Sequence, residues 1–232
     1  MLIGSGLLAT AFVPMFSHRE DVCIYAAGVS NSSCTTPSEF GRETQRLSDA
    51  LSLALSTDAF VYFGTCSALD PDAWNTPYVL HKLKMEKLVA EHPKHLIVRL
   101  PQVAGRTPNP HTLLNFLYAR ISRSESFQLW TKAKRNIIDV DDVAALVGQF
   151  VADGSLRNIR LNIANPYNYA MCDIVTAMEH VLGKRATYDA TGRGSDYHID
   201  VTEMLRVQDS AGVRFSEDYL KRAIGKYYGK SR

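Results

Sequence analysis

A tyrosine and a lysine four positions apart are the residue pair in this sequence best suited to chemistry. Tyr78 and Lys82 lie in Pro77–Glu91, where Thr76 suits a helix N-cap and proline suits the first helical position. Positions i and i+4 share one helix face, so Lys82 is expected to lower the pKa of Tyr78 from about 10. Tyr78 could then exchange a proton with a substrate oxygen. The alternative is a pair of surface neighbours without a catalytic role.

Hydroxyl side chains follow the apolar run Val61–Phe63, shortly before this helix. Thr65 and Ser67 come at the end of that run, which has the character of a buried strand. In open α/β sheets, ligands bind at the carboxyl ends of the strands. Thr65, with Ser67 as the second candidate, could therefore hydrogen-bond a substrate carbonyl or alcohol beside Tyr78. An ordinary turn after a strand is the alternative.

A glycine-rich turn near the N-terminus has the spacing of a dinucleotide site. Gly4, Gly6 and Ala9 fit the pattern G-x-G-x-x-A between a short apolar run and a helical stretch. In such a site the first glycine permits the tight turn, and the second lets the backbone approach a pyrophosphate. The alanine lets the helix pack against the sheet, and free N–H groups at the helix start favour phosphate. A plain glycine turn would show the same pattern.

The uncharged N-terminus allows a second interpretation of the same segment. Residues 1–17 are apolar and contain Ala9-Thr10-Ala11, which resembles a signal-peptide cleavage site. The segment lacks the positively charged start of a signal peptide, and glycines interrupt it, so the dinucleotide interpretation is favoured. No other segment has the apolar length of a membrane span, and membrane insertion is not expected.

The composition is typical of a globular protein and argues against nucleic-acid binding and metal binding as functions. The 232 residues are 46% hydrophobic and carry a net charge of +2, with acidic and basic residues interspersed. This balance argues against a nucleic-acid-binding surface, which needs a basic patch. The four cysteines show neither C-x-x-C spacing nor a zinc-type cluster with histidine. We therefore expect reduced thiols, no metal site and a cytoplasmic location.

Strand-like and helix-like segments alternate, which predicts a parallel sheet with helices on both faces. The expected strands are Met1–Ile3, Val22–Ala26, Phe60–Phe63, Leu96–Leu100 and Arg160–Ala164, and the expected helices are Leu7–Phe16, Glu39–Ser56, Pro77–Glu91, His111–Arg123, Asp141–Asp153, Met171–Leu182 and Ser216–Tyr228.

The order of these motifs resembles one enzyme family. The glycine turn is followed by a strand ending in Ala26-Ala27, by Thr65-Cys66-Ser67, and by the Tyr78/Lys82 pair. Downstream, Arg99–Gly105 is similar to an R-L-P-N-V-x-G segment, and Arg135–Ala144 to an R-D-F-I-H-V-x-D-V-A segment. Leu161–Ala164 followed by a helix also fits. In this order the motifs resemble those of the extended short-chain dehydrogenase/reductases, the NAD-dependent sugar epimerase/dehydratase family.

The resemblance implies an abbreviated, Rossmann-like, doubly wound parallel sheet with a small C-terminal α/β lobe for substrate. Residues 1–160 would form the cofactor-binding core, with an excursion toward substrate at about 104–135, and residues 161–232 would be mainly the substrate lobe. The implied activity is NAD- or NADP-dependent keto-reduction or epimerisation of a nucleotide-linked sugar in surface polysaccharide biosynthesis. A homodimer through Glu39–Ser56 and Pro77–Glu91 is also implied. A non-catalytic cofactor-binding or sensing protein with the same fold is the alternative.

The resemblance also assigns residues to roles. Thr65 or Ser67 would be the catalytic hydroxyl, Tyr78 the acid and base, and Lys82 its partner. Arg135 would hold a phosphate of the nucleotide-sugar by a bidentate contact, although a surface cation is the alternative. The cofactor would contact Gly4, Gly6, Leu7, Leu8, Ala9, Ala26, Ala27, Gly28, Lys82, Pro101 and Val103, and the substrate would contact Gln102, His111 and Arg135.

The chain departs from the family pattern in three ways. Two strands are missing between the glycine turn and Val22–Ala26, and Glu20 and Asp21 come before Val22–Ala26 rather than after it, where an acid would hold the adenosine ribose. Ser30 or Asn31 is expected to meet that ribose instead. Gln102 stands where the family has asparagine. Cys66 and Ser67 are not carboxyl groups, which makes a dehydratase less favoured than a reductase or an epimerase.

Overall fold

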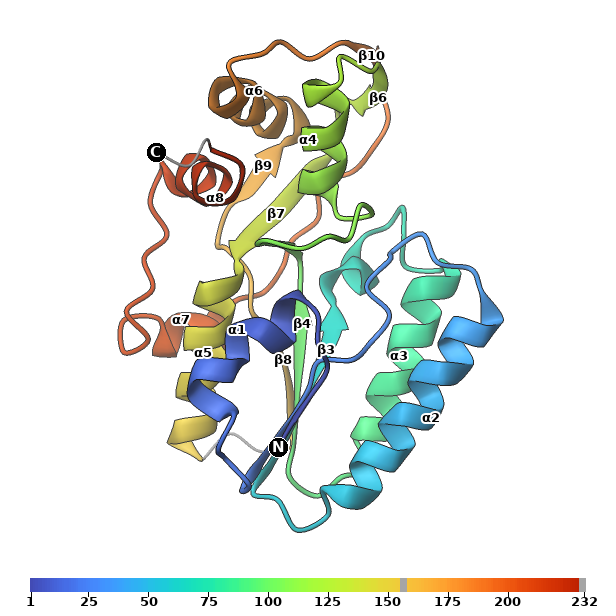
Figure 1. Ribbon diagram of the computed structural model, residues 1–232, viewed down its shortest axis with the longest axis vertical. Coiled ribbons are helices and arrows are strands. Elements are labelled where there is room, and N and C mark those ends of the chain that lie inside the picture. Colours follow the sequence, from blue (N-terminus) through green and yellow to red (C-terminus); the bar gives the residue numbers. More distant parts are fainter. Residues whose placement is uncertain (155–157, 230–232) are drawn as a thin grey trace.

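Five parallel strands form the central sheet of the protein, in the order β1-β2-β3-β4-β8 (Figure 1). The computed structural model describes residues 1–154 and 158–229. All seven residues of β3 are buried because helices cover both faces of the sheet. The strands are β1 (Leu2–Ile3), β2 (Val22–Tyr25), β3 (Ala59–Thr65), β4 (His95–Leu100) and β8 (Ile159–Asn162).

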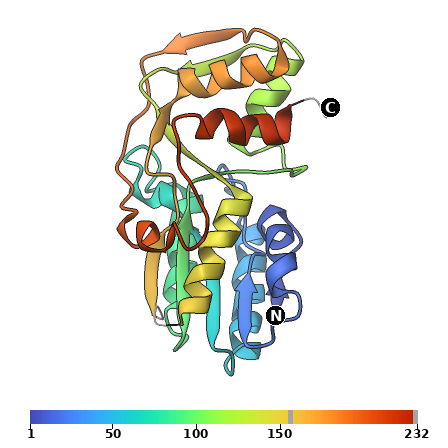
Figure 2. The same ribbon diagram turned by 90° about the vertical axis from the view of Figure 1, so that its left-hand side faces the viewer.

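Two hydrophobic cores lie on opposite faces of this sheet. On one face, Phe12 of helix α1 (Leu7–Phe16) and Phe150 of helix α5 (Val140–Asp153) pack against Ile24 and Val61. On the other, helices α2 (Pro37–Leu53) and α3 (Pro77–Val89) pack against alternate residues of the same strands. Figure 2 shows α1, α5 and the short helix α7 (Thr202–Val207) in front of the sheet, with α2 and α3 behind it.

The crossover connection from β1 to β2 has a different handedness from the next two crossovers along the chain. The strand order advances in one direction from β1 to β4, and α1 crosses on the opposite face from α2 and α3. The β1–α1–β2 crossover therefore has the opposite hand to β2–α2–β3 and β3–α3–β4, although such crossovers are nearly always right-handed. As a result, β1 is the edge strand of the described sheet, and α1 packs on the face opposite α2 and α3.

A smaller lobe stands beyond the carboxyl ends of the strands. It has its own core, built around Leu117, Ile137 and Met178. Figure 1 shows this lobe above the sheet, joined to it by β7 and α5. Its strands are β5 (Gln102–Ala104), β6 (Phe127–Trp130), β7 (Lys134–Asp139), β9 (Asn168–Ala170) and β10 (Tyr188–Thr191), and its helices are α4 (Leu113–Ser122), α6 (Met171–Leu182) and α8 (Tyr219–Tyr228).

The α/β class and the parallel, Rossmann-like sheet expected from the sequence are confirmed. The expected boundary at residue 160 falls inside β8, and residues near Met204 return from the lobe to pack on the core around the sheet. Helix α8 begins at Tyr219 rather than at Ser216, because the Ser216 hydroxyl bonds Asp218 instead of capping the helix. The five strands of the lobe, β5, β6, β7, β9 and β10, were not expected; all but β7 are only 3 or 4 residues long.

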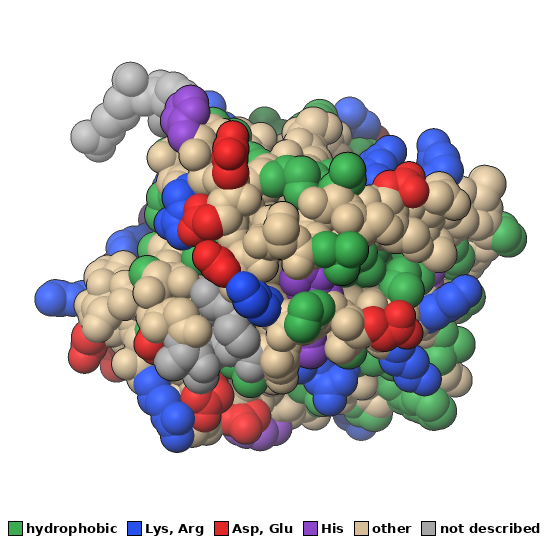
Figure 3. Space-filling view, turned by 90° about the horizontal axis from the view of Figure 1, so that it is seen from below, with side chains coloured by type: hydrophobic (Ala, Val, Ile, Leu, Met, Phe, Trp, Pro, Cys, Tyr) green, Lys and Arg blue, Asp and Glu red, His purple; other side chains and the backbone are tan. Residues whose placement is uncertain are grey.

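The end of the molecule opposite the lobe carries interspersed acidic and basic side chains with scattered hydrophobic ones (Figure 3). In the described part of the chain, no helix has the length and apolar character needed to cross a bilayer.

Candidate active site

A cavity of about 910 Å³ opens at the carboxyl ends of β1 to β4, between the sheet and the lobe. Its walls include the glycine turn, the segment after β2, the end of β3 and the face of α3 that carries Tyr78 and Lys82. Most of the residues that the sequence singled out line it. These are Gly4, Gly6, Leu7, Leu8, Ala26, Ala27, Gly28, Ser30, Asn31, Thr65, Ser67, Tyr78, Lys82, Pro101, Gln102, Val103 and His111.

The glycine turn has the geometry of a phosphate cradle. Gly4 has φ +132°, and a Cβ there would lie 2.4 Å from the carbonyl oxygen of Ala26, so a side chain is excluded. Gly6 caps α1, and a Cβ there would meet nothing within 4 Å. The start of α1 therefore presents backbone N–H groups to open space in the cavity wall, which suits a pyrophosphate.

Tyr78 and Thr65 meet through their hydroxyl groups at the cavity wall. The Thr65 hydroxyl lies near enough to that of Tyr78 to lower its pKa, and it accepts the N–H of Ser67 at 3.1 Å. Helix α3 holds Tyr78 there because Thr76 caps its first turn, accepting the Val79 N–H. Thr65 and Ser67 face the cavity, while Cys66 between them is buried in the core.

The expected effect of Lys82 on Tyr78 was wrong. Burial raises the pKa of Tyr78 well above its usual value; the hydrogen bond from Thr65 lowers it in part, and the charge of Glu43 raises it further. Lys82 does not offset this because its ammonium is engaged elsewhere, in an ion pair with Glu43 at 3.2 Å. Tyr78 is therefore a phenol in the protein without ligands.

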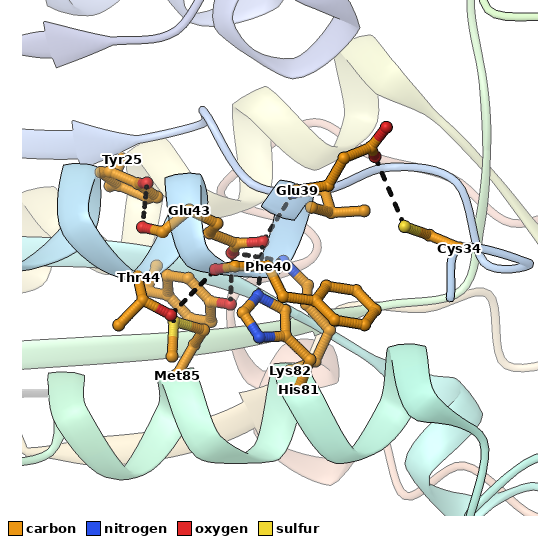
Figure 4. Close-up of polar contacts among 11 residues, drawn as sticks. Tyr25, Cys34, Glu39, Phe40, Glu43, Thr44, His81, Lys82 and Met85 are labelled. Carbon is orange, nitrogen blue, oxygen red and sulfur yellow. Dashed lines mark hydrogen bonds and ion pairs between the residues drawn. The ribbon is translucent and has the colours of Figure 1, made fainter. Parts of the chain in front are cut away.

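Glu43 on α2 is the centre of a buried polar cluster at the wall of the cavity (Figure 4). Its carboxylate accepts the Lys82 ammonium, the Tyr62 hydroxyl at 3.1 Å and the Val29 N–H at 2.7 Å, and contacts His81 Nε2 at 3.0 Å. Burial pushes the pKa of Glu43 upward, but Lys82, the Val29 N–H and His81 outweigh it, so the pKa lies below its usual value. Glu43 is thus a buried carboxylate that all four partners stabilise.

Two residues assigned to the site lie outside the cavity lining. Ala9 is buried, which suits its expected role in helix packing. Arg135 lies at the junction with the lobe, where its guanidinium bonds the Lys134 carbonyl at 2.8 Å and stands 3.9 Å from Asp70. Its assignment to a substrate phosphate stays a prediction.

Several cavity residues were missed by sequence reasoning. Asn109 donates to the Ser30 hydroxyl at 3.1 Å and so joins the loop after β2 to the loop after β5 across the site. Arg46 lines the cavity beside Glu43, which no motif indicated. Glu43 had a detectable signal, since it falls between Phe40 and Leu47 on the apolar side of a predicted helix.

The groups that line the cavity suit a dinucleotide by their chemistry. The tight turn at Gly4 and the open space at Gly6 suit phosphates, and Lys82 and Tyr78 line the same cavity with donors for hydroxyl groups. Among the described residues, no group of three His, Cys, Asp or Glu side chains is placed to hold a metal ion. Groups suited to binding phosphates and a group suited to exchanging a proton therefore line one cavity.

Comparison with known proteins agrees with this geometry. The sequence model of the NAD dependent epimerase/dehydratase family matches residues 10–164. No curated protein matches the chain.

Solved structures with the same fold include nucleotide-sugar enzymes. The UDP-glucose 4-epimerase of Thermus thermophilus, in complex with NAD, has a TM-score of 0.72 and 14% identity, covering 97% of this chain and 83% of its own. A UDP-glucuronic acid 4-epimerase mutant of Bacillus cereus has a TM-score of 0.69 and 17% identity, covering 87% of this chain and 76% of its own. The dTDP-glucose 4,6-dehydratase DesIV of Streptomyces venezuelae has a TM-score of 0.70 and 15% identity, covering 88% of this chain and 72% of its own. At these identities the likeness establishes the fold.

Proposed function

Because the chain belongs to the NAD dependent epimerase/dehydratase family, we propose that it is an NAD(P)-dependent enzyme acting on a nucleotide-linked sugar. The reaction is a keto-reduction or an epimerisation, and surface polysaccharide biosynthesis is the setting in which we place it. The observation that supports this most is the Tyr78–Thr65 hydroxyl pair, which shares a cavity with the glycine turn and Lys82.

Each residue has a separate task in this proposal. Gly4, Gly6 and the start of α1 bind the pyrophosphate of the cofactor, and Lys82 donates to a ribose hydroxyl. Bound NAD(P) would supply or take up the hydride. Tyr78 exchanges the proton on the sugar oxygen, and Thr65 donates a hydrogen bond that stabilises the phenolate form of Tyr78. The small lobe, with Gln102 and His111 at the cavity wall, holds the sugar nucleotide.

The assembly follows from the same proposal. A homodimer through α2 and α3 would cover the exposed Leu53 and Leu80 on those helices. Neither of these two leucines takes part in the chemistry described above.

The test combines cofactor binding with turnover. The purified protein is titrated with NADH and NADPH by fluorescence and then incubated with NAD⁺ and UDP-glucose, UDP-galactose or UDP-glucuronic acid. We expect NADH binding in the micromolar range and conversion of at least one sugar. Tight NADH binding without turnover of any nucleotide-sugar would favour the sensing alternative, and absence of binding would contradict the proposal.

A further inference from the structure

Glu43 is a buried charge that the proposed chemistry does not use. It is 3% exposed, and Lys82 beside it is 4% exposed. The titratable groups around it come from every element packed there, namely Tyr25 on β2, Tyr62 on β3, and Tyr78, His81, Lys82 and Glu86 on α3. A buried carboxylate needs partners to offset its desolvation, and the nearest cation is Lys82.

The chain leaves space for this ion pair at Gly28. A Cβ on Gly28 would lie 2.6 Å from Lys82 Nζ and 2.8 Å from Glu43 Oε1. Gly28 lies in the cavity wall, so the backbone passes directly over the pair without a side chain. The ammonium is also fixed from the side, because Lys82 Nζ lies 4.9 Å from the centre of the Tyr62 ring.

We propose that Glu43 is a positioning residue for Lys82. Its carboxylate holds the lysine ammonium at the cavity wall and controls how much of that charge reaches a cofactor ribose and the Tyr78 hydroxyl. This inference rests on the proposed function, since it assumes that Lys82 meets the cofactor.

The geometry leaves Lys82 able to serve two partners. An ammonium has three N–H donors, and Glu43 takes one of them in the structure. The carboxylate thereby fixes the direction of a side chain that otherwise has four rotatable bonds. A fixed ammonium loses little conformational freedom when a ribose hydroxyl binds, so the affinity for the cofactor rises.

The first test measures how accessible the Lys82 ammonium is to a chemical reagent, without any cofactor. The protein is treated briefly with acetic anhydride, and acetylation of Lys82 is measured by peptide mass spectrometry relative to the exposed Lys87 on the same helix. Glu43→Gln keeps the size of the side chain and removes its charge, and we expect the relative labelling of Lys82 to rise roughly tenfold. The matched control is Asp49→Asn, which removes one charge from the exposed side of α2 and should leave the labelling unchanged.

The second test is a double-mutant cycle in NADH affinity, using Glu43→Gln, Lys82→Met and the double variant. We expect Glu43→Gln to weaken NADH binding about tenfold with Lys82 present, and less than twofold in the Lys82→Met background. A residue with a purely structural role would have the same effect in both backgrounds.

The outcomes separate this inference from the proposed function. If the wild-type protein binds NADH but Glu43→Gln changes neither Lys82 labelling nor NADH affinity, Glu43 does not position Lys82. If Glu43→Gln fails to fold and the double variant folds, the dependence of Lys82 on Glu43 is supported directly. If both fail to fold, Glu43 is structural and the inference is overturned. Absence of NADH binding by the wild-type protein would instead contradict the proposed function.

Discussion

Replacing Tyr78 by phenylalanine should reduce turnover of the nucleotide-sugar about 10³-fold while leaving NADH affinity within about threefold of the wild type. The substitution removes one hydroxyl group from a side chain that is otherwise buried. That hydroxyl lies beside Thr65 at the cavity wall, and it is the group that we expect to exchange the proton with the sugar oxygen. Binding should persist because the glycine turn and Lys82 are unchanged. Turnover and NADH affinity are measured on the same preparation.

A second hydroxyl provides the control for this experiment. Tyr167 is exposed and does not line the cavity, so Tyr167→Phe should leave both quantities unchanged. Normal turnover by Tyr78→Phe would show that another group supplies the proton. A parallel loss of NADH binding would show that Tyr78 serves the cofactor site instead.

Replacing Gly4 by alanine should have the largest effect on the fold. The backbone at Gly4 has φ +132°, and the new Cβ would lie 2.4 Å from a backbone carbonyl, which cannot move aside as a flexible side chain can. We expect the free energy of unfolding to fall by about 3 kcal/mol and NADH binding to weaken severely, because the turn must open. Urea denaturation and NADH titration measure the two effects.

Gly6 offers a matched comparison two residues later. A Cβ at Gly6 would meet nothing within 4 Å, and its φ of −85° is accessible to any residue. Gly6→Ala should therefore change the free energy of unfolding by less than about 1 kcal/mol. It should still weaken NADH binding about tenfold or more, because the methyl group occupies the space where the pyrophosphate approaches the backbone. Equal effects of the two substitutions on stability would contradict this account of the turn.

Local sequence signals predicted the elements of the core well. Thr76 and Pro77 marked the start of α3 correctly, and the expected helix Met171–Leu182 has the same bounds as α6. Short sequence patterns were enough to find the main site features. These are the glycine turn, the hydroxyl residues after β3, and the Tyr78/Lys82 pair, whose spacing places both residues on one helix face. They lie around one cavity because parallel strands bring their carboxyl ends to one edge.

Long-range features could not be predicted in the same way. The hand of the β1–α1–β2 crossover depends on which face α1 packs against, which no residue of α1 encodes alone. The state of Lys82 depends on Glu43, which is 39 residues away on another helix. The i, i+4 spacing of Tyr78 and Lys82 indicated a phenol and an ammonium on one helix face. It could not show that the ammonium forms an ion pair with a carboxylate from α2.

The central claim is that Tyr78 and Lys82 face the nicotinamide end of a dinucleotide held by the glycine turn. A crystal structure of the protein with NAD⁺ measures this directly. We expect the pyrophosphate at the N–H groups of residues 6 to 8, and a nicotinamide-ribose hydroxyl within about 3 Å of Lys82 Nζ, with the nicotinamide ring beside the Tyr78 hydroxyl. A dinucleotide bound away from the Gly4–Gly6 turn, or one whose nicotinamide points away from Tyr78, would contradict the account.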